Sequence, residues 1–519
     1  MSSEAKGGKF GFVGVCLLGF IAFLDFSIIA TALPLIQAEL HMPVEELQWL
    51  VNTYALMLCI LMATAGRAAD VFGHARVLMF AVLLFGVASL AAGFSSSGGV
   101  LIFWRALQGI GGATLFPVAA ATVTLIKPPE ERGRSLGIYN SCGGFGMAIG
   151  PILGGALLSV AGWEWVFWVN VPVIALALVL CATSGLLSVK ADGEETKMDW
   201  GGSVLMICGL SGLALAAIQG PQWGWLSLKT GAVFLLGCVG ILALVLYEAR
   251  WAKHPLLDFQ LLSAPLFVAG CVTACLGGLT VGVLMFIDPI YLQNILLFTP
   301  FELGVAMCVI SVVFAVISPF SGRLTDRLGF YVPLMLTGGA LVVTCGFHLL
   351  FSPHYSLALL LAAFITFGMV WGMANVVGIG ACLSAAGPER AGGAVGLGGT
   401  FWNLSAAAGL GVAVGLFQWG EKLSLNRQLA ALPAKLSDAQ VELLRLLLNR
   451  PQHAARILHE DAAAGHAPNK VIEIFRIAFC DGLHDMAWFV GGAGVVAMII
   501  FALLRRHFMP NEGPSGERS

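Results

Sequence analysis

The chain has 519 residues, of which 58% are hydrophobic and 11% charged, and its formal net charge is −2. A soluble domain carries about 25% charged residues, so this composition excludes a water-soluble protein. The sequence has no basic stripe for a nucleic-acid partner, no P-loop of an ATP-driven pump and no cysteine pair with zinc-ligand spacing.

Apolar runs of bilayer length, separated by polar, Pro or Gly residues, predict about fourteen membrane-spanning helices. The first run follows a short basic segment and is longer than a signal peptide allows, so we expect it to be retained as a span. The expected spans are 10–34, 47–69, 77–96, 99–125, 135–161, 164–188, 201–220, 229–248, 266–293, 303–322, 331–351, 356–384, 392–419 and 482–505.

Lys and Arg are concentrated in alternate short loops of this arrangement. Cytoplasmic loops carry such an excess, so both termini are expected in the cytoplasm, which requires an even number of spans. The expected location is the plasma membrane, for example the inner membrane of a bacterium.

An internal repeat divides the chain. Residues 66–73 and 322–329 both read G-R-x-x-D-x-x-G, and they follow spans 2 and 10. The simplest account is two six-helix halves with two inserted central helices between them. Repeated halves are typical of secondary transporters, in which one half rocks against the other. The sequence therefore predicts an all-α polytopic membrane protein of this two-half type.

These boundaries define the expected regions of the chain. A capping-box sequence at Ser437 predicts a small helical cap within the outer loop, with a mobile loop as the alternative. The regions are the cytoplasmic N-terminus 1–9, the N-terminal six-helix half 10–188, a cytoplasmic linker 189–200, the inserted hairpin 201–248, a second cytoplasmic linker 249–265, the C-terminal six-helix half 266–505 with its outer loop 420–481, and the cytoplasmic tail 506–519.

Two charged residues lie inside expected spans of the N-terminal half. Asp25 is in the middle of span 1, and Arg105 is in span 4. A charge at the centre of a membrane helix costs roughly 2.5–3.5 kcal/mol on insertion scales, so it faces the protein interior and is usually functional. Arg105 needs a carboxylate or carbonyl partner and is expected to point at the seam between the halves. The alternative for Asp25 is a purely structural, hydrogen-bonded acid.

Several stretches together resemble the major facilitator superfamily, and within it the fourteen-span drug:proton antiporters of the EmrB/QacA type. Residues 24–34 are similar to the span-1 motif L-D-x-T-x-x-N-x-A-L-P, with Ala30 in place of Asn. Residues 101–111 match the span-4 motif L-x-x-x-R-x-x-Q-G-x-G. Residues 163–172 resemble W-R-W-x-F-x-x-N-x-P, with Glu164 in place of Arg. The resemblance implies proton coupling by Asp25 and Arg105.

The repeated loops resemble the superfamily's G-x-L-x-D-R-x-G-R-R/K-R motif, although the first copy lacks most of its basic residues. In that family the motif joins the two halves. The resemblance implies that Asp70, Asp326 and Arg327 form a conformational latch.

Span 5 carries the spacing G-x8-G-x3-G-P-x2-G-G, which resembles the motif typical of antiporters in the superfamily. The glycines flatten one helix face for close contact, and the proline allows a bend. A plain packing face without bearing on direction is the alternative. The motif residues are Gly146, Gly150, Pro151, Gly154 and Gly155.

Asp288 in span 9 is a candidate for binding a cationic substrate. The following Pro289 frees the carbonyl of Met285, and Tyr291 is on the same helix face. An acid, a free carbonyl and an aromatic ring together can form a binding site for an organic cation. The alternative is that Asp288 meets interfacial water.

The preferred function is proton-driven efflux of amphipathic small molecules, with no cofactor and no catalytic or metal site. The partners are then the small-molecule substrate, protons and the lipid bilayer, with a periplasmic adaptor in a Gram-negative cell. Proton-coupled uptake or facilitated diffusion of a metabolite on the same fold is the second hypothesis. A membrane receptor or scaffold is the third, but it would not need both Asp25 and Arg105 inside the membrane.

Overall fold

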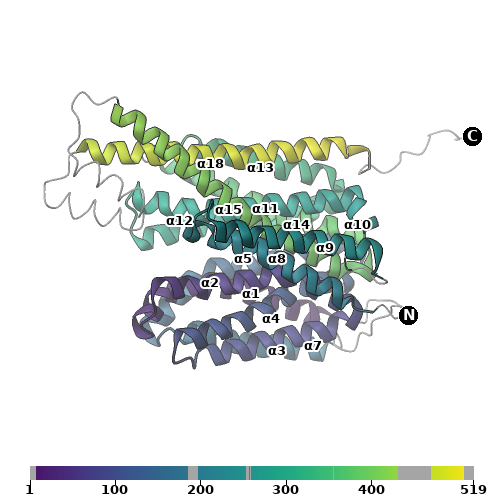
Figure 1. Cartoon of the computed structure of the whole chain (residues 1–519). Helices are drawn as coiled ribbons and strands as arrows, with labels where there is room; N and C mark the ends of the chain where they lie inside the picture. Colours follow the sequence, from purple (N-terminus) through teal and green to yellow (C-terminus); the bar gives the residue numbers. More distant parts are fainter. Residues whose placement is uncertain are drawn as a thin grey trace, which may run out of the picture.

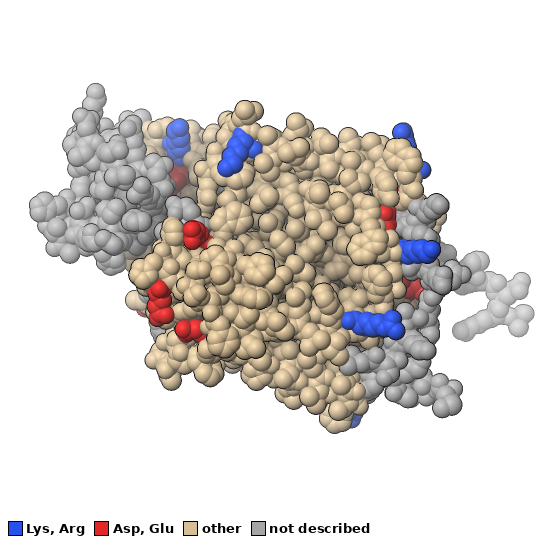
Figure 2. Space-filling model, turned by 60° about the horizontal axis from the view of Figure 1, so that its bottom comes forward, with Lys and Arg blue, Asp and Glu red and all other residues tan. Residues whose placement is uncertain are grey.

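The computed structural model describes residues 8–184, 197–252, 256, 259–354, 356–430 and 469–507. In this part of the chain, fourteen helices are long and apolar enough to cross a membrane. They run roughly parallel in one bundle (Figure 1). In Figure 2 the Lys, Arg, Asp and Glu side chains lie toward the two ends of the bundle, and the middle of this face is free of them. This distribution fits an apolar belt in contact with lipid.

The N-terminal half contains seven helical segments that form six spans, because α6 and α7 follow each other in one span. They are α1 (Lys9–Glu39), α2 (Val44–Phe72), α3 (His74–Ala92), α4 (Gly98–Leu125), α5 (Arg132–Val160), α6 (Trp165–Trp168) and α7 (Asn170–Thr183).

The C-terminal half repeats this arrangement. After the short α10 (Phe259–Ser263), its spans are α11 (Pro265–Asn294), α12 (Pro300–Leu328), α13 (Tyr331–His348), α14 (Leu357–Ala386), α15 (Ala391–Ala430) and α18 (Asn469–Leu503). α1 begins and α18 ends at the same end of the bundle (Figure 1). The halves meet where α2 packs against α15 and α5 against α12, so the two contacts are equivalent under the repeat.

The inserted hairpin consists of α8 (Trp200–Trp223) and α9 (Leu228–Arg250). α8 packs against both α2 and α15 and so covers one of the two seams from outside. Side chains of Asp199 and Ser227 accept hydrogen bonds from backbone N–H groups in the first turns of α8 and α9. These caps explain where each helix begins after a polar loop.

The expected outer loop 420–481 is too long at both ends, because α15 continues to Ala430 and α18 already begins at Asn469. Hydropathy did not reveal the last turns of α15 and the first turns of α18, because these turns are polar. Ser424 on α15 donates a hydrogen bond to Asp481 on α18, so the two extensions satisfy each other's polar groups. The predicted helical cap at Ser437 lies outside the described residues.

Candidate functional site

A buried ion pair lies inside the N-terminal half. Nη1 of Arg105 on α4 is 2.8 Å from Oδ2 of Asp25 on α1, and each side chain is 1% exposed. Nε of Arg105 donates to the carbonyl oxygen of Leu50 at 3.2 Å, and the guanidinium lies 4.4 Å from the ring centroid of Tyr54. Both charges therefore have the partners that a charge inside a membrane requires.

Polar side chains from three further positions complete a network around Asp25. Gln108 and Asn170 donate to its Oδ1 at 2.7 and 2.9 Å. Asn170 also donates to the hydroxyl of Ser89, which donates to the carbonyl oxygen of Phe167. The network ties α1 to α3, α4 and the start of α7.

A proton on Asp25 would change this arrangement. Neutralising one member of a buried pair leaves the other charge uncompensated, at a cost of about 3–5 kcal/mol. A change of charge on Asp25 would therefore disturb the contacts between α1 and α4. Arg105 differs from expectation in one respect: its partners all lie in the N-terminal half, so it does not point at the seam between the halves.

Asp70 joins the two halves at one end of the bundle. Its two carboxylate oxygens accept from the backbone N–H groups of Gly392 and Gly393, each at 2.7 Å, in the first turn of α15. His74 Nε2 is 3.4 Å from the same carboxylate, whose side chain is 2% exposed. A carboxylate at a helix N-terminus is stabilised by the unpaired N–H groups and by the helix dipole.

Asp326 makes the equivalent contact from the other half. It accepts from the backbone N–H groups of Gly133 at 3.1 Å and Arg134 at 2.9 Å, in the first turn of α5. Each aspartate of the repeat thus caps a helix of the opposite half. Arg327 is exposed in the last turn of α12, and its neighbour Asp326 makes the bonds across the seam.

The helices approach closely beside both caps. A Cβ on Gly66 would collide with the backbone of Gly392, and a Cβ on Gly322 would collide with the backbone of Gly133. The first glycine and the aspartate of each repeat copy therefore act together, one allowing contact and the other bonding across it. This end of the seam is closed.

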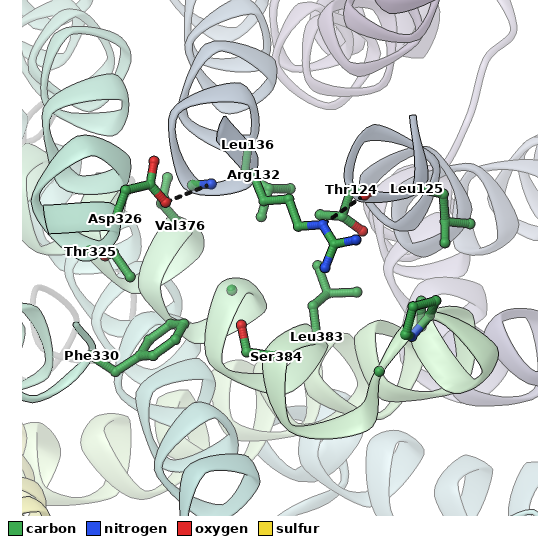
Figure 3. Close-up of a pocket in the computed structure, with 15 residues that line it drawn as sticks. Thr124, Leu125, Arg132, Leu136, Thr325, Asp326, Phe330, Val376, Leu383 and Ser384 are labelled. Atoms are coloured by element: carbon green, nitrogen blue, oxygen red, sulfur yellow. Dashed lines mark hydrogen bonds between the residues drawn. The ribbon is translucent and has the colours of Figure 1, made fainter. Parts of the chain in front are cut away.

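A cavity of about 250 Å³ lies at this closed end (Figure 3). Arg132 borders it, and its Nε donates to the carbonyl oxygen of Thr124 at 3.0 Å. Its walls come from both halves, so opening of the seam would change it. The lining residues are Thr124, Leu125, Arg132, Gly133, Leu136, Thr325, Asp326, Phe330, Val376, Gly380, Leu383, Ser384, Gly387, Pro388 and Ala391.

Three of the span-5 glycines face α1. Added Cβ atoms on Gly146, Gly150 and Gly154 would collide with Phe20, Ser27 and Thr31, respectively, whereas one on Gly155 would meet no other described residue within 4 Å. The flattened face therefore lies inside the N-terminal half, against the helix that carries the Asp25 carboxylate. Pro151 lies inside α5 between these glycines.

A second cavity, of about 150 Å³, lies between the halves. No Asp, Glu, Lys, Arg or His is present among its described lining residues, and its polar groups are amides, indole N–H groups, a phenol and a thiol. The lining residues are Phe23, Phe26, Leu58, Met62, Phe116, Ala120, Tyr139, Asn140, Met147, Ala274, Val281, Trp371, Ala374, Asn375, Gly378, Ile379, Cys382, Val395, Gly398, Gly399, Trp402 and Asn403.

Asp288 and Tyr291 lie outside this central cavity. Asp288 is 0% exposed, and its Oδ1 is 3.1 Å from Nε2 of His348 on α13. The hydroxyl of Tyr291 donates to the carbonyl oxygen of Ser352, and its ring stacks on Phe351. Neither residue lines the central cavity. This placement gives no support to their expected role in substrate binding, because each is already engaged within the C-terminal half.

Sequence reasoning did not assign a role to Ser89, Asn170 or His348. Each is a polar residue in or beside an apolar span, and this was the available signal. Each of them has a partner that is 60 or more positions away along the chain. The walls of the central cavity carried no such signal, since most of its residues are ordinary components of apolar helices.

Comparison with known proteins gives consistent matches. The model of the Major Facilitator Superfamily matches residues 15–410. The multidrug resistance protein Stp of Mycobacterium tuberculosis is 31% identical over 406 residues, which are 78% of this chain and 74% of that protein. The tetracenomycin C resistance and export protein of Streptomyces glaucescens is 33% identical over 332 residues, 64% of this chain and 61% of that protein.

Among solved structures, the human organic anion transporter TETRAN aligns with a TM-score of 0.61 at 14% identity, covering 94% of this chain and 98% of that chain. At this identity the similarity shows the fold alone. It confirms the expected arrangement of helices.

Proposed function

The chain belongs to the major facilitator superfamily, a family of transporters and not of enzymes, and we propose that it exports uncharged, aromatic amphipathic molecules in exchange for protons. The relatives named for drug resistance and export support the direction. The observation that carries the proposal is the position of α1, which holds the buried Asp25–Arg105 pair and also lines the central cavity.

The substrate class follows from the cavity walls. Aromatic rings of Phe23, Phe116, Trp371 and Trp402 offer stacking surfaces, and amides such as Asn375 offer hydrogen bonds. A carboxylate among the described wall residues would attract organic cations, but none is present. Such a cavity favours neutral ring systems with a few polar groups over permanently charged molecules.

Coupling between proton and substrate follows from α1, which contributes to both sites. Phe23 and Phe26 line the cavity, and Asp25 between them points to the other side of α1, toward Arg105. Proton binding at Asp25 loosens the bonds that hold α1 to α4. A shift or rotation of α1 then changes the cavity wall, so that proton and substrate bias the same conformational equilibrium. The energy source is a proton gradient, without a cofactor.

We place the latched end in the cytoplasm and the protein in the plasma membrane, because Lys and Arg of the short loops favour that orientation. The structure then corresponds to a state closed toward the cytoplasm. The Asp25 network lies toward the opposite end, near the start of α2 (Leu50) and the end of α3 (Ser89). Asp25 is thereby positioned to receive protons from outside.

The direct test uses the purified protein in liposomes with an imposed pH gradient. Nile red, an uncharged fluorescent dye, should move against the direction of proton flow, and ethidium, a permanent cation, should move more slowly. Asp25→Asn should abolish proton-driven transport of Nile red while the exposed-acid control Glu46→Gln retains it. Movement of dye and protons in the same direction would instead establish a symporter, the second hypothesis.

The cavity itself is tested by one added charge. Asn375→Asp places a carboxylate among the aromatic walls with little change of shape. Ethidium transport should rise relative to Nile red transport by tenfold or more. An unchanged ratio would show that substrates do not occupy this cavity.

A further inference from the structure

A second pair of titratable residues lies in the C-terminal half, apart from Asp25. Asp288 on α11 and His348 at the end of α13 are both 0% exposed, and Nε2 of His348 is 3.1 Å from Oδ1 of Asp288. α11 and α13 are the counterparts of α1 and α3, which the Asp25 network connects through Asn170 and Ser89. Each half thus has a polar connection between its first and third helices.

The contacts of His348 show that this pair holds a proton. Its Nδ1 is 2.8 Å from the carbonyl oxygen of Thr344, which can only accept, so Nδ1 carries a hydrogen. The contact between Nε2 and Asp288 at 3.1 Å then needs a second hydrogen, on the imidazole or on the carboxyl group. In both arrangements the pair is neutral overall, and loss of this proton leaves a net charge of −1.

The second oxygen of Asp288 distinguishes it from Asp25. Oδ2 of Asp288 is buried and has no hydrogen-bond partner in the described part of the chain. Both oxygens of Asp25, in contrast, accept from buried donors. An unpaired buried oxygen is unfavourable in a membrane interior, so Asp288 depends on His348 for its polar contact, whereas Asp25 has donors on both of its oxygens.

Phe351 lies between the buried pair and a more exposed one, and its ring centroid is 4.7 Å from that of His348. The carbonyl oxygen of Phe351 is 2.9 Å from Nε2 of His484 on α18. The side chain of His484 is 29% exposed, and its Nδ1 is 4.0 Å from Asp481, which is 48% exposed. A partly exposed histidine–aspartate pair therefore lies one aromatic residue away from the buried pair.

Other titratable or charged groups lie on or beside the helices that form or pack against this region. They are Tyr291 on α11, Cys345 on α13, His354 before α14, Arg476, Cys480, Asp481, His484 and Asp485 on α18, and Glu421, Lys422 and Arg427 on α15.

We propose that Asp288 and His348 form a second proton-binding site, which exchanges its proton with water past His484 and loads and unloads once in each transport cycle. On release the proton passes from the pair to water, and the pair changes from neutral to a charge of −1. The proposal that this pair binds a proton does not depend on what the protein transports. The role in the cycle rests on the proposed export function.

Proton binding is tested without a substrate, by infrared difference spectroscopy of the purified chain in liposomes during a pH titration. The wild type should show a step in its carboxyl and imidazole bands that is lost in both Asp288→Asn and His348→Gln. Thr344→Val is the matched control, since the Thr344 hydroxyl bonds to Ala340 and only its backbone carbonyl touches His348. The control should keep the step. Identical titrations of the wild type and both variants would overturn the site.

The role in the cycle is tested by counting protons moved per Nile red in liposomes that contain a pH-sensitive dye. With two proton sites in use, Asp288→Asn and His348→Gln should lower the ratio about twofold, and Thr344→Val should leave it unchanged. An unchanged ratio in variants that have lost the infrared step would refute the role in transport. Failure of every variant and of the wild type to move Nile red would count against the export function but not against the proton site.

Discussion

The two aspartate caps across the seam offer a measurable perturbation. Asp70→Asn and Asp326→Asn each keep the shape of the side chain but remove its charge and one of its two acceptor oxygens. Both bonds that each carboxylate makes are to the opposite half, so their loss destabilises the state in which this end is closed. The expected result is a shift toward opening at this end.

The magnitude follows from the bonds. A hydrogen bond to a charged group contributes about 1.5–3 kcal/mol, and a charge at a helix N-terminus about 0.3–2 kcal/mol. Because Asn preserves one weaker bond, we expect Asp70→Asn to cost about 2 kcal/mol, or roughly thirtyfold in the equilibrium. Asp326 is more exposed than Asp70, so its substitution should have a smaller effect.

The assay is a distance distribution between spin labels on Arg76→Cys in the N-terminal half and Arg327→Cys in the C-terminal half, in a cysteine-free background. Both positions are exposed near the closed end. Glu130→Gln removes an exposed charge at the same end without touching the caps and serves as the control. The shift toward opening in the double variant should equal the sum of the shifts in the two single variants. Distributions that stay at the closed distance in Asp70→Asn would refute a latch made by these bonds.

Three further predictions follow from the site. Arg105→Lys keeps the charge but loses the planar donors that reach three partners, so proton-driven Nile red efflux should fall at least tenfold; wild-type rates would mean that charge alone suffices. Gly154→Val should impair transport by overpacking α1, at about 1–3 kcal/mol, whereas Gly155→Val should not; equal rates would place the helix contact elsewhere. A single cysteine at Leu226 should react with a membrane-impermeant thiol reagent added outside, whereas one at Arg506 should react only from the cytoplasmic side. The reverse pattern would show that the topology is inverted.

Much of this protein was predictable from the sequence, because a membrane imposes strong local rules. A span needs a long apolar run, so all fourteen candidate spans were found by composition. A buried charge needs a partner, so Asp25 and Arg105 were identified before their contact was known. The repeated glycine and aspartate indicated two related halves. Polar helix extensions were missed at α15 and α18, because hydropathy registers only the apolar part of a helix.

The partners of these residues were decided by tertiary structure. Nothing in the sequence near Asp288 indicates His348, which lies 60 positions away, so an acid beside a tyrosine was interpreted as a cation site. The direction in which Arg105 points was likewise set by the packing of α1, α2 and α4. The central cavity exists only where helices of both halves leave space between apolar faces. A residue's type and helix position follow from local sequence, whereas the group it meets depends on how distant helices pack.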